Sequence, residues 1–99
     1  MMVCTLVIYD IVEDKVRRRI AEVCKDYGLD RIQYSAFFGL TDRNRREEMM
    51  LKFRRTLGDT EGNIQMYVIC EKDIRLKKEL SVNGYDPFRT EELRARAAG

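Results

Sequence analysis

Residues 31–40, RIQYSAFFGL, decide the fold of this chain of 99 residues. Every second residue from Ile32 to Phe38 belongs to one face, and this period of two is typical of a β-strand. Gly39 weakens the run, which indicates a bend or a tight connection between strands near this residue. The pattern leaves open whether the stretch is one bent strand or two short ones.

The chain before this stretch predicts a strand followed by a helix. Residues 3–9, VCTLVIY, form a continuous apolar run of strand length, which favours a strand inside a sheet, and Asp10 ends it. From Asp14 onward the apolar residues return at helical spacing, and this stripe comprises Val16, Ile20, Val23, Cys24 and Tyr27. Asp14 is the expected N-cap, and Gly28 is the expected residue just after the helix.

The chain after this stretch predicts a second helix and another strand. Thr41 or Asp42 can cap a helix whose buried stripe comprises Met49, Met50, Phe53 and Leu57. Residues 63–71 alternate again and predict a strand. Residues 73–80 suit one or two helical turns, and residues 81–85 suit a short edge strand that Pro87 ends. Residues 90–98 predict a frayed helix or a disordered end.

The resulting order is strand, helix, one or two strands, helix and strand. With a split middle strand this is the α+β ferredoxin-like βαββαβ arrangement, here with a short extra C-terminal strand. We therefore predict one domain over residues 1–99, with a core over 1–85 and a tail over 86–99. Both helices of such a domain cover one face of the sheet, whereas residues 3–9 are apolar on both sides. This predicts a homodimer formed through the uncovered face, the edge strands or both.

The composition excludes several classes of function. The net charge is only +2, so charge alone does not indicate a nucleic-acid-binding protein, although the basic residues are mostly Arg. The chain lacks His, which excludes Ser-His and Cys-His nucleophile pairs. Three widely spaced cysteines in apolar stretches predict buried free thiols; they are Cys4, Cys24 and Cys70. No long apolar run or signal pattern is present, so we expect a cytoplasmic protein without membrane contact.

Asp10 is the first candidate for chemistry. It follows a rigid apolar strand, and a carboxylate held there can bind Mg²⁺ or Mn²⁺, which prefer oxygen ligands. One carboxylate is too few for a metal site, but a dimer axis near this strand end would add the Asp10 of a second subunit. The alternative is an Asp that ends the strand and caps the following turn.

Basic and aromatic residues are candidates for nucleic-acid contact. Arg17, Arg18 and Arg19 follow Asp10 closely and can reach phosphates near a metal, or they belong to an ordinary charged helix. The second helix carries a surplus of basic residues that suits a duplex backbone, with a solvated helix face as the alternative. Its arginines are Arg43, Arg45, Arg46, Arg54 and Arg55. The aromatic residues are core or interface residues, or they stack on an unpaired base; these are Tyr9, Tyr34, Phe37 and Tyr67.

Two strings of this chain, in register with each other, resemble the CRISPR-associated Cas2 family. One is Tyr9-Asp10-Ile11 at the end of the first strand, and the other is residues 31–37, RIQYSAF. The resemblance extends over roughly residues 1–71 and implies a ferredoxin-like homodimer in which Asp10 is the metal-binding residue, paired across the dimer. It also implies a site with further polar, basic and aromatic residues, namely Tyr9, Arg17, Arg19, Arg31, Ser35 and Phe37.

The same resemblance implies two classes of function. One is a metal-dependent endonuclease that cleaves single-stranded RNA or double-stranded DNA. The other is an architectural DNA-binding subunit that bridges two dimers of the Cas1 integrase during the insertion of new CRISPR spacers. A small toxin-type endoribonuclease of the same fold is a more remote alternative.

Overall fold

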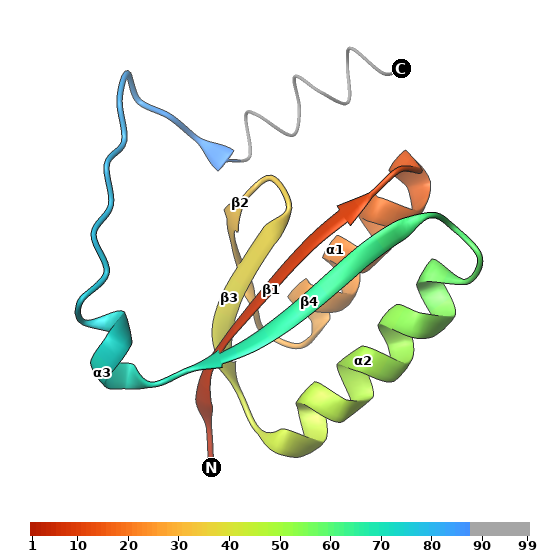
Figure 1. Cartoon of the computed structure of the whole chain (residues 1–99), viewed down its shortest axis with the longest axis horizontal. Helices are drawn as coiled ribbons and strands as arrows, with labels where there is room; N and C mark the ends of the chain where they lie inside the picture. The colour runs from red at the N-terminus through yellow and green to blue at the C-terminus, as the bar shows by residue number, and fades with distance from the viewer. Residues whose placement is uncertain (88–99) are drawn as a thin grey trace.

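One antiparallel sheet and two long helices make up most of the chain (Figure 1). The computed structural model describes residues 1–87. The strands are β1 (Val3–Ile11), β2 (Asp30–Gln33), β3 (Ala36–Thr41) and β4 (Gly62–Ile69). The helices are α1 (Asp14–Asp26), α2 (Arg43–Leu57) and the single turn α3 (Glu71–Ile74). The strand order β2-β3-β1-β4, with α1 and α2 on the same face, confirms the predicted ferredoxin-like arrangement.

The stretch that decides the fold forms two strands, and their connection lies at Tyr34 and Ser35. The predicted break near Gly39 is therefore in the wrong place, because Gly39 lies inside β3. A Cβ atom at Gly39 would lie 2.9 Å from Leu29 Cδ2 and 3.1 Å from the carbonyl oxygen of Gly28. Glycine is thus needed there because the segment after α1 passes close to β3.

The two long helices begin in different ways. The N-cap of α1 is Glu13, without a side-chain cap, so the prediction of Asp14 was wrong. Asp14 is the first helical residue, and its carboxylate instead bonds to the guanidinium of Arg17. Asp42 caps α2 as predicted, since its Oδ1 accepts a hydrogen bond of 2.8 Å from the backbone N–H of Arg45.

The core lies between the sheet and the two long helices. Alternate residues of β1 face the helices and are buried, and these are Thr5, Val7, Tyr9 and Ile11. The helices contribute Ile20 and Cys24 from α1, and Met49 and Phe53 from α2. Met50 was predicted in this core, but it is 42% exposed because it lies beside the buried stripe of α2.

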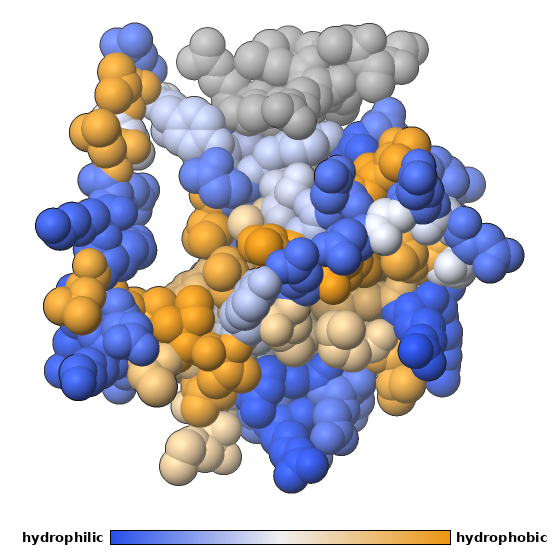
Figure 2. Space-filling view, viewed as in Figure 1, coloured by the Kyte–Doolittle hydropathy of each residue, from blue (hydrophilic) through white to orange (hydrophobic). Residues whose placement is uncertain are grey.

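The other set of alternate residues forms the open face, the side of the sheet without α1 or α2. Its apolar members are Leu6, Ile8, Phe38, Leu40, Tyr67 and Ile69, and β1 adds Asp10 to the same face. Figure 2 shows hydrophobic side chains gathered over the sheet on the side turned to the viewer. Leu40 is 55% exposed and Tyr67 is 48% exposed. In the single chain this face is an incompletely covered apolar surface.

The chain beyond β4 adds little to the sheet. Residues 81–85 form no strand in the described structure, so the prediction of a short extra strand was wrong for this part of the chain. The φ angles of Asn83 and Gly84 are 58° and 64°, and these values make a turn rather than an extended segment. The Tyr85 hydroxyl donates a hydrogen bond of 2.7 Å to Gln33 Oε1. The predicted helix or disordered end at residues 90–98 lies outside the described residues.

Candidate metal and nucleic-acid site

Asp10 lies at the end of β1 and is exposed on the open face. The turn between β2 and β3 lies on one side of it, because the backbone N–H of Tyr9 donates a 3.0 Å hydrogen bond to the carbonyl oxygen of Ser35. On the other side, Asn63 of β4 is the direct cross-strand partner of Asp10. No group of three or more acidic, His or Cys residues within residues 1–87 could hold a metal ion. A single subunit therefore offers one carboxylate here.

Arg17 joins three segments around Asp10. Its Nη1 donates a 2.8 Å hydrogen bond to the carbonyl oxygen of Ile11, and its Nη2 bonds to the carboxylate of Asp14. The guanidinium carbon also lies 5.4 Å from the centre of the Tyr34 ring. The side chain thus connects the end of β1, the first turn of α1 and the turn before β3. These contacts give Arg17 a structural role at the site, whereas Arg18 and Arg19 are exposed.

Three predicted site residues lie on the opposite face of the sheet from Asp10. Tyr9, Arg31 and Phe37 are only 5%, 7% and 0% exposed. The Tyr9 and Phe37 rings stack with their centres 6.4 Å apart, and the Arg31 guanidinium lies 4.9 Å from the centre of the Phe37 ring. The structure therefore does not bring these side chains together with the Asp10 carboxylate.

Burial also changes the acid-base behaviour of the Tyr9 side chain. It raises the pKa of Tyr9 to about 12, although the positive charge of Arg31 acts in the opposite direction. The Tyr9 phenol is therefore protonated at neutral pH and cannot serve as a general base there. Ser35 is half-buried in its turn, and its main contact with the site is the backbone hydrogen bond to Tyr9.

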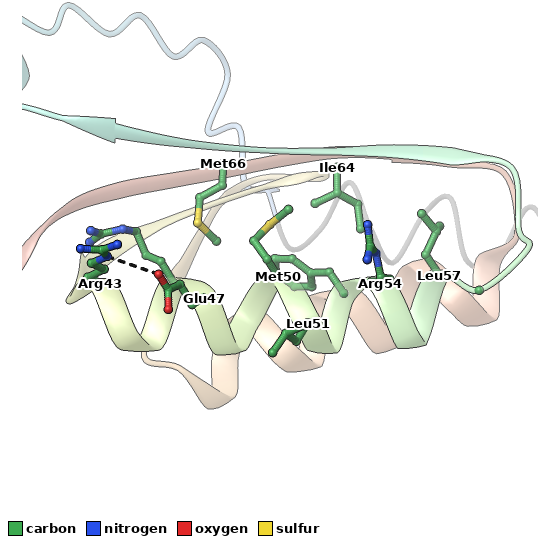
Figure 3. A pocket seen from close by; sticks show the side chains of 11 residues that line it. Arg43, Glu47, Met50, Leu51, Arg54, Leu57, Ile64 and Met66 are labelled. Atoms are coloured by element: carbon green, nitrogen blue, oxygen red, sulfur yellow. Dashed lines mark hydrogen bonds and ion pairs between the residues drawn. The ribbon is translucent and has the colours of Figure 1, made fainter.

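The basic residues of α2 do not share one face. Arg43, Arg46 and Arg54 line a groove between α2 and β4, which we call the α2–β4 groove (Figure 3). Its apolar lining includes Met50, Leu57, Ile64 and Met66. On the other side of α2, the Lys52 ammonium lies 4.9 Å from the centre of the Tyr27 ring of α1.

Several α2 arginines already have partners within the chain. Arg43 Nε lies 3.3 Å from Glu47 Oε1, and Arg46 Nη1 lies 3.3 Å from the carbonyl oxygen of Thr41. Arg54 and Arg55 are exposed near the end of the helix. The predicted basic surplus is therefore divided between two sides of α2, and it is less concentrated than the sequence suggested.

The cysteines are free, but they differ in exposure. Cys24 is buried as predicted, and burial raises its pKa to about 12. The prediction was wrong for Cys70, which is exposed, and for Cys4, which is only partly buried. Cys70 follows the end of β4, and Cys4 lies on the open face, so neither position reaches the core.

Sequence reasoning missed a polar row on the open face of β4, made of Asn63, Gln65 and Tyr67. Gln65 Nε2 donates a 2.8 Å hydrogen bond to Asn63 Oδ1, and the Tyr67 hydroxyl donates to Gln65 Oε1. The alternation of β4 carried a signal, because polar residues there alternate with the more apolar Ile64 and Met66. The location of this row beside Asp10 depends on strand pairing.

These features define a small ferredoxin-like protein that carries one exposed carboxylate at the end of its first strand. A family model described as CRISPR associated protein Cas2 matches residues 1–76, and the chain belongs to this family. No helix within residues 1–87 is long and apolar enough to cross a membrane.

Similar proteins agree with this assignment. A protein from Desulforudis audaxviator named CRISPR-associated endoribonuclease Cas2 is 53% identical over 83 residues, which cover 84% of this chain and 78% of that protein. A Thermoproteus tenax protein named as a fusion of endonucleases Cas1 and Cas2 is 30% identical over 69 residues, 70% of this chain and 26% of the fusion. The crystal structure of Streptococcus pyogenes Cas2 at pH 6.5 has a TM-score of 0.68 and 24% identity. It shares the fold over 82% of this chain and 100% of that chain.

Proposed function

We propose that the protein is a homodimeric, divalent-metal-dependent endoribonuclease in which the Asp10 residues of both subunits hold one Mg²⁺ or Mn²⁺. The observation that carries this proposal is the exposed Asp10 on the open face, in a chain that is 53% identical to a relative named an endoribonuclease. The Asp10 carboxylates of the two subunits fit the ion, because Mg²⁺ keeps several waters and needs only one or two carboxylates. When bound, such an ion stabilises charge on a phosphate and activates water.

The residues around Asp10 have separate parts in this proposal. Arg17 holds the end of β1 and the adjacent turn in place through its contacts with Ile11 and Tyr34. The exposed Arg18 and Arg19 are available to balance the charge of a phosphate near the site. Tyr9, Arg31 and Phe37 support the site from the core. In this proposal they stabilise β1, β2 and β3 and do not touch the substrate.

The homodimer is part of the proposal because one subunit provides only one carboxylate. The open face supports it, since Leu40 and Tyr67 are about half exposed beside Leu6, Ile8 and Phe38. Burial of such a surface against a second copy removes apolar area from water. Multi-angle light scattering should find a dimer at micromolar concentration. A stable monomer would contradict both the dimer and the shared metal site.

A second candidate function is an architectural subunit that binds duplex DNA and joins the Cas1 integrase during spacer acquisition in the cytoplasm. The fusion protein of Thermoproteus tenax favours it, because that protein is named as Cas1 and Cas2 joined in one chain. The exposed Arg54 and Arg55 of α2 supply charge for the DNA backbone. In this function the Asp10 carboxylate is not required.

The decisive experiment compares cleavage of RNA and DNA by purified protein with Mg²⁺ or with EDTA. In Asp10→Asn we expect metal-dependent cleavage to fall by about a hundredfold or more, because each metal site loses both carboxylates. The matched control is Asp59→Asn, an exposed carboxylate in the loop before β4, which should cleave as the native protein does. Asp10→Asn should remain a dimer, because it removes two carboxylates that repel each other across the dimer when no metal is bound. Full cleavage by Asp10→Asn would show that the cleavage comes from a contaminant or from another site, and it would refute the proposed Asp10 metal site.

A further inference from the structure

The polar row on β4 has no part in the proposed function so far, although it begins beside Asp10. Asp10 and Asn63 are directly paired across β1 and β4. The preceding pair, Tyr9 and Ile64, faces the helices, so Asp10 and Asn63 both face the open side. Directly opposite residues in an antiparallel pair have Cβ atoms about 5 Å apart. Both side chains are exposed, so their oxygens are accessible to an ion from solvent.

The orientation of the Asn63 amide is determined by its neighbours in the row. Gln65 Nε2 donates to Asn63 Oδ1, and the Tyr67 hydroxyl donates to the Oε1 atom of Gln65. An amide oxygen has two lone pairs, and the Gln65 hydrogen bond uses one of them. The second lone pair can bind a cation. Such a hydrogen bond orients the amide before an ion binds, so less side-chain freedom is lost on binding.

We infer that Asn63 Oδ1 is a second oxygen ligand that each subunit contributes to the divalent cation at Asp10, and that Gln65 and Tyr67 position it. This inference rests on the proposed metal site. Hard cations such as Mg²⁺ and Mn²⁺ bind both carboxylate and amide oxygens. A site with Asp10 and Asn63 from two subunits has four protein oxygen ligands, and this compensates for the single acidic residue in each chain.

The test measures Mn²⁺ binding to the full-length protein without nucleic acid, by following free Mn²⁺ with electron paramagnetic resonance. Asn63→Ala should bind Mn²⁺ about tenfold more weakly, since it loses the ligand oxygen but no charge. Asn63→Asp should bind Mn²⁺ about tenfold more tightly, because it adds a carboxylate within reach of the ion.

The matched control is Gln33→Glu, which adds the same charge to the open face about 10 Å from β1, because Gln33 pairs with Ala36 and Ala36 pairs with Ile8. Its long-range attraction should weaken strongly in 1 M salt, where the screening length is about 3 Å. The tighter binding by Asn63→Asp should largely persist in 1 M salt, because direct ligation is screened much less than a distant charge.

The outcomes separate this inference from the proposed function. If Asp10→Asn loses Mn²⁺ binding while both Asn63 variants bind as the native protein does, the Asn63 ligand is refuted and the Asp10 site stands. If Asp10→Asn binds Mn²⁺ normally, or the native protein binds none, the proposed metal site fails and the Asn63 ligand with it. An increase in Gln33→Glu as large and as salt-resistant as that in Asn63→Asp would also refute direct ligation.

Discussion

Replacement of Arg17 with Met should lower the free energy of unfolding by about 2–4 kcal/mol. The hydrogen bond from the guanidinium to the Ile11 carbonyl contributes about 1.5–3 kcal/mol, since its donor is charged. The partly exposed ion pair with Asp14 adds at most about 1 kcal/mol. The contact with the Tyr34 ring adds about 0.5–1 kcal/mol. These contributions share one side chain, so their sum is an upper estimate.

Urea unfolding at a fixed subunit concentration measures this effect, because the stability of a dimer depends on concentration. Arg19→Met is the matched control on the same helix, and its exposed side chain should change the free energy of unfolding by less than about 0.5 kcal/mol. Arg17→Lys should recover only part of the loss, since an ammonium cannot form the same fork of hydrogen bonds. Equal effects of Arg17→Met and Arg19→Met would refute the structural role of Arg17.

Three further predictions concern the thiols, alkaline pH and DNA. A thiol reagent added to the native protein should modify Cys70 quickly and Cys24 only after unfolding, because Cys24 is buried with a pKa of about 12; equal rates would contradict this. The free energy of unfolding should fall as pH rises from about 9 to 12, since native Tyr9 and Cys24 keep protons that the unfolded chain releases. Denaturant unfolding across this pH range should show a smaller loss of unfolding free energy in Cys24→Ala than in the native protein. Substitution of Arg54 and Arg55 by Ala should weaken duplex DNA binding and reduce its salt slope by about two, and an unchanged slope would mark a solvated helix face.

Local periodicity was sufficient to predict most of the fold. The continuous apolar run of residues 3–9 and the period of two in residues 63–71 correspond to β1 and β4, and the helical spacing from Asp14 and Asp42 corresponds to α1 and α2. The split between β2 and β3 could not be located, because Tyr34 and Ser35 continue the alternation through the turn without Gly or Pro. The role of Gly39 was misinterpreted, because a glycine is required there by the close approach of Leu29 from another segment of the chain.

The error at residues 81–85 has a different cause. Ser81 and Val82 have the composition of an edge strand, but a strand exists only where another strand pairs with it. In the described chain this segment turns at Asn83 and Gly84, and the Tyr85 hydroxyl donates a hydrogen bond to Gln33 of β2. Composition alone cannot show whether a partner strand is present.

The site residues were predicted unevenly because a sequence string contains both faces of a strand. Asp10 was identified by its position at a strand end, and the structure leaves it exposed. Tyr9 and Phe37 belong to the same strings, yet their side chains lie on the opposite face of the sheet, in the core. A string shared with a family therefore marks a site without separating the residues that touch a ligand from those that support them.

The composition of the site beyond Asp10 is decided by the register of β1 and β4, which local patterns do not contain. A slip of one residue would place Ile64 opposite Asp10 and turn Asn63 toward the helices. Gly62 allows the close approach that this register needs. A Cβ atom there would lie 3.1 Å from the Asp10 carbonyl oxygen and 3.1 Å from Ile11 Cγ1. A larger residue at this position would require these neighbours to move by a few tenths of an ångström, so glycine suits the close approach of β4 to the end of β1 beside the Asp10–Asn63 pair.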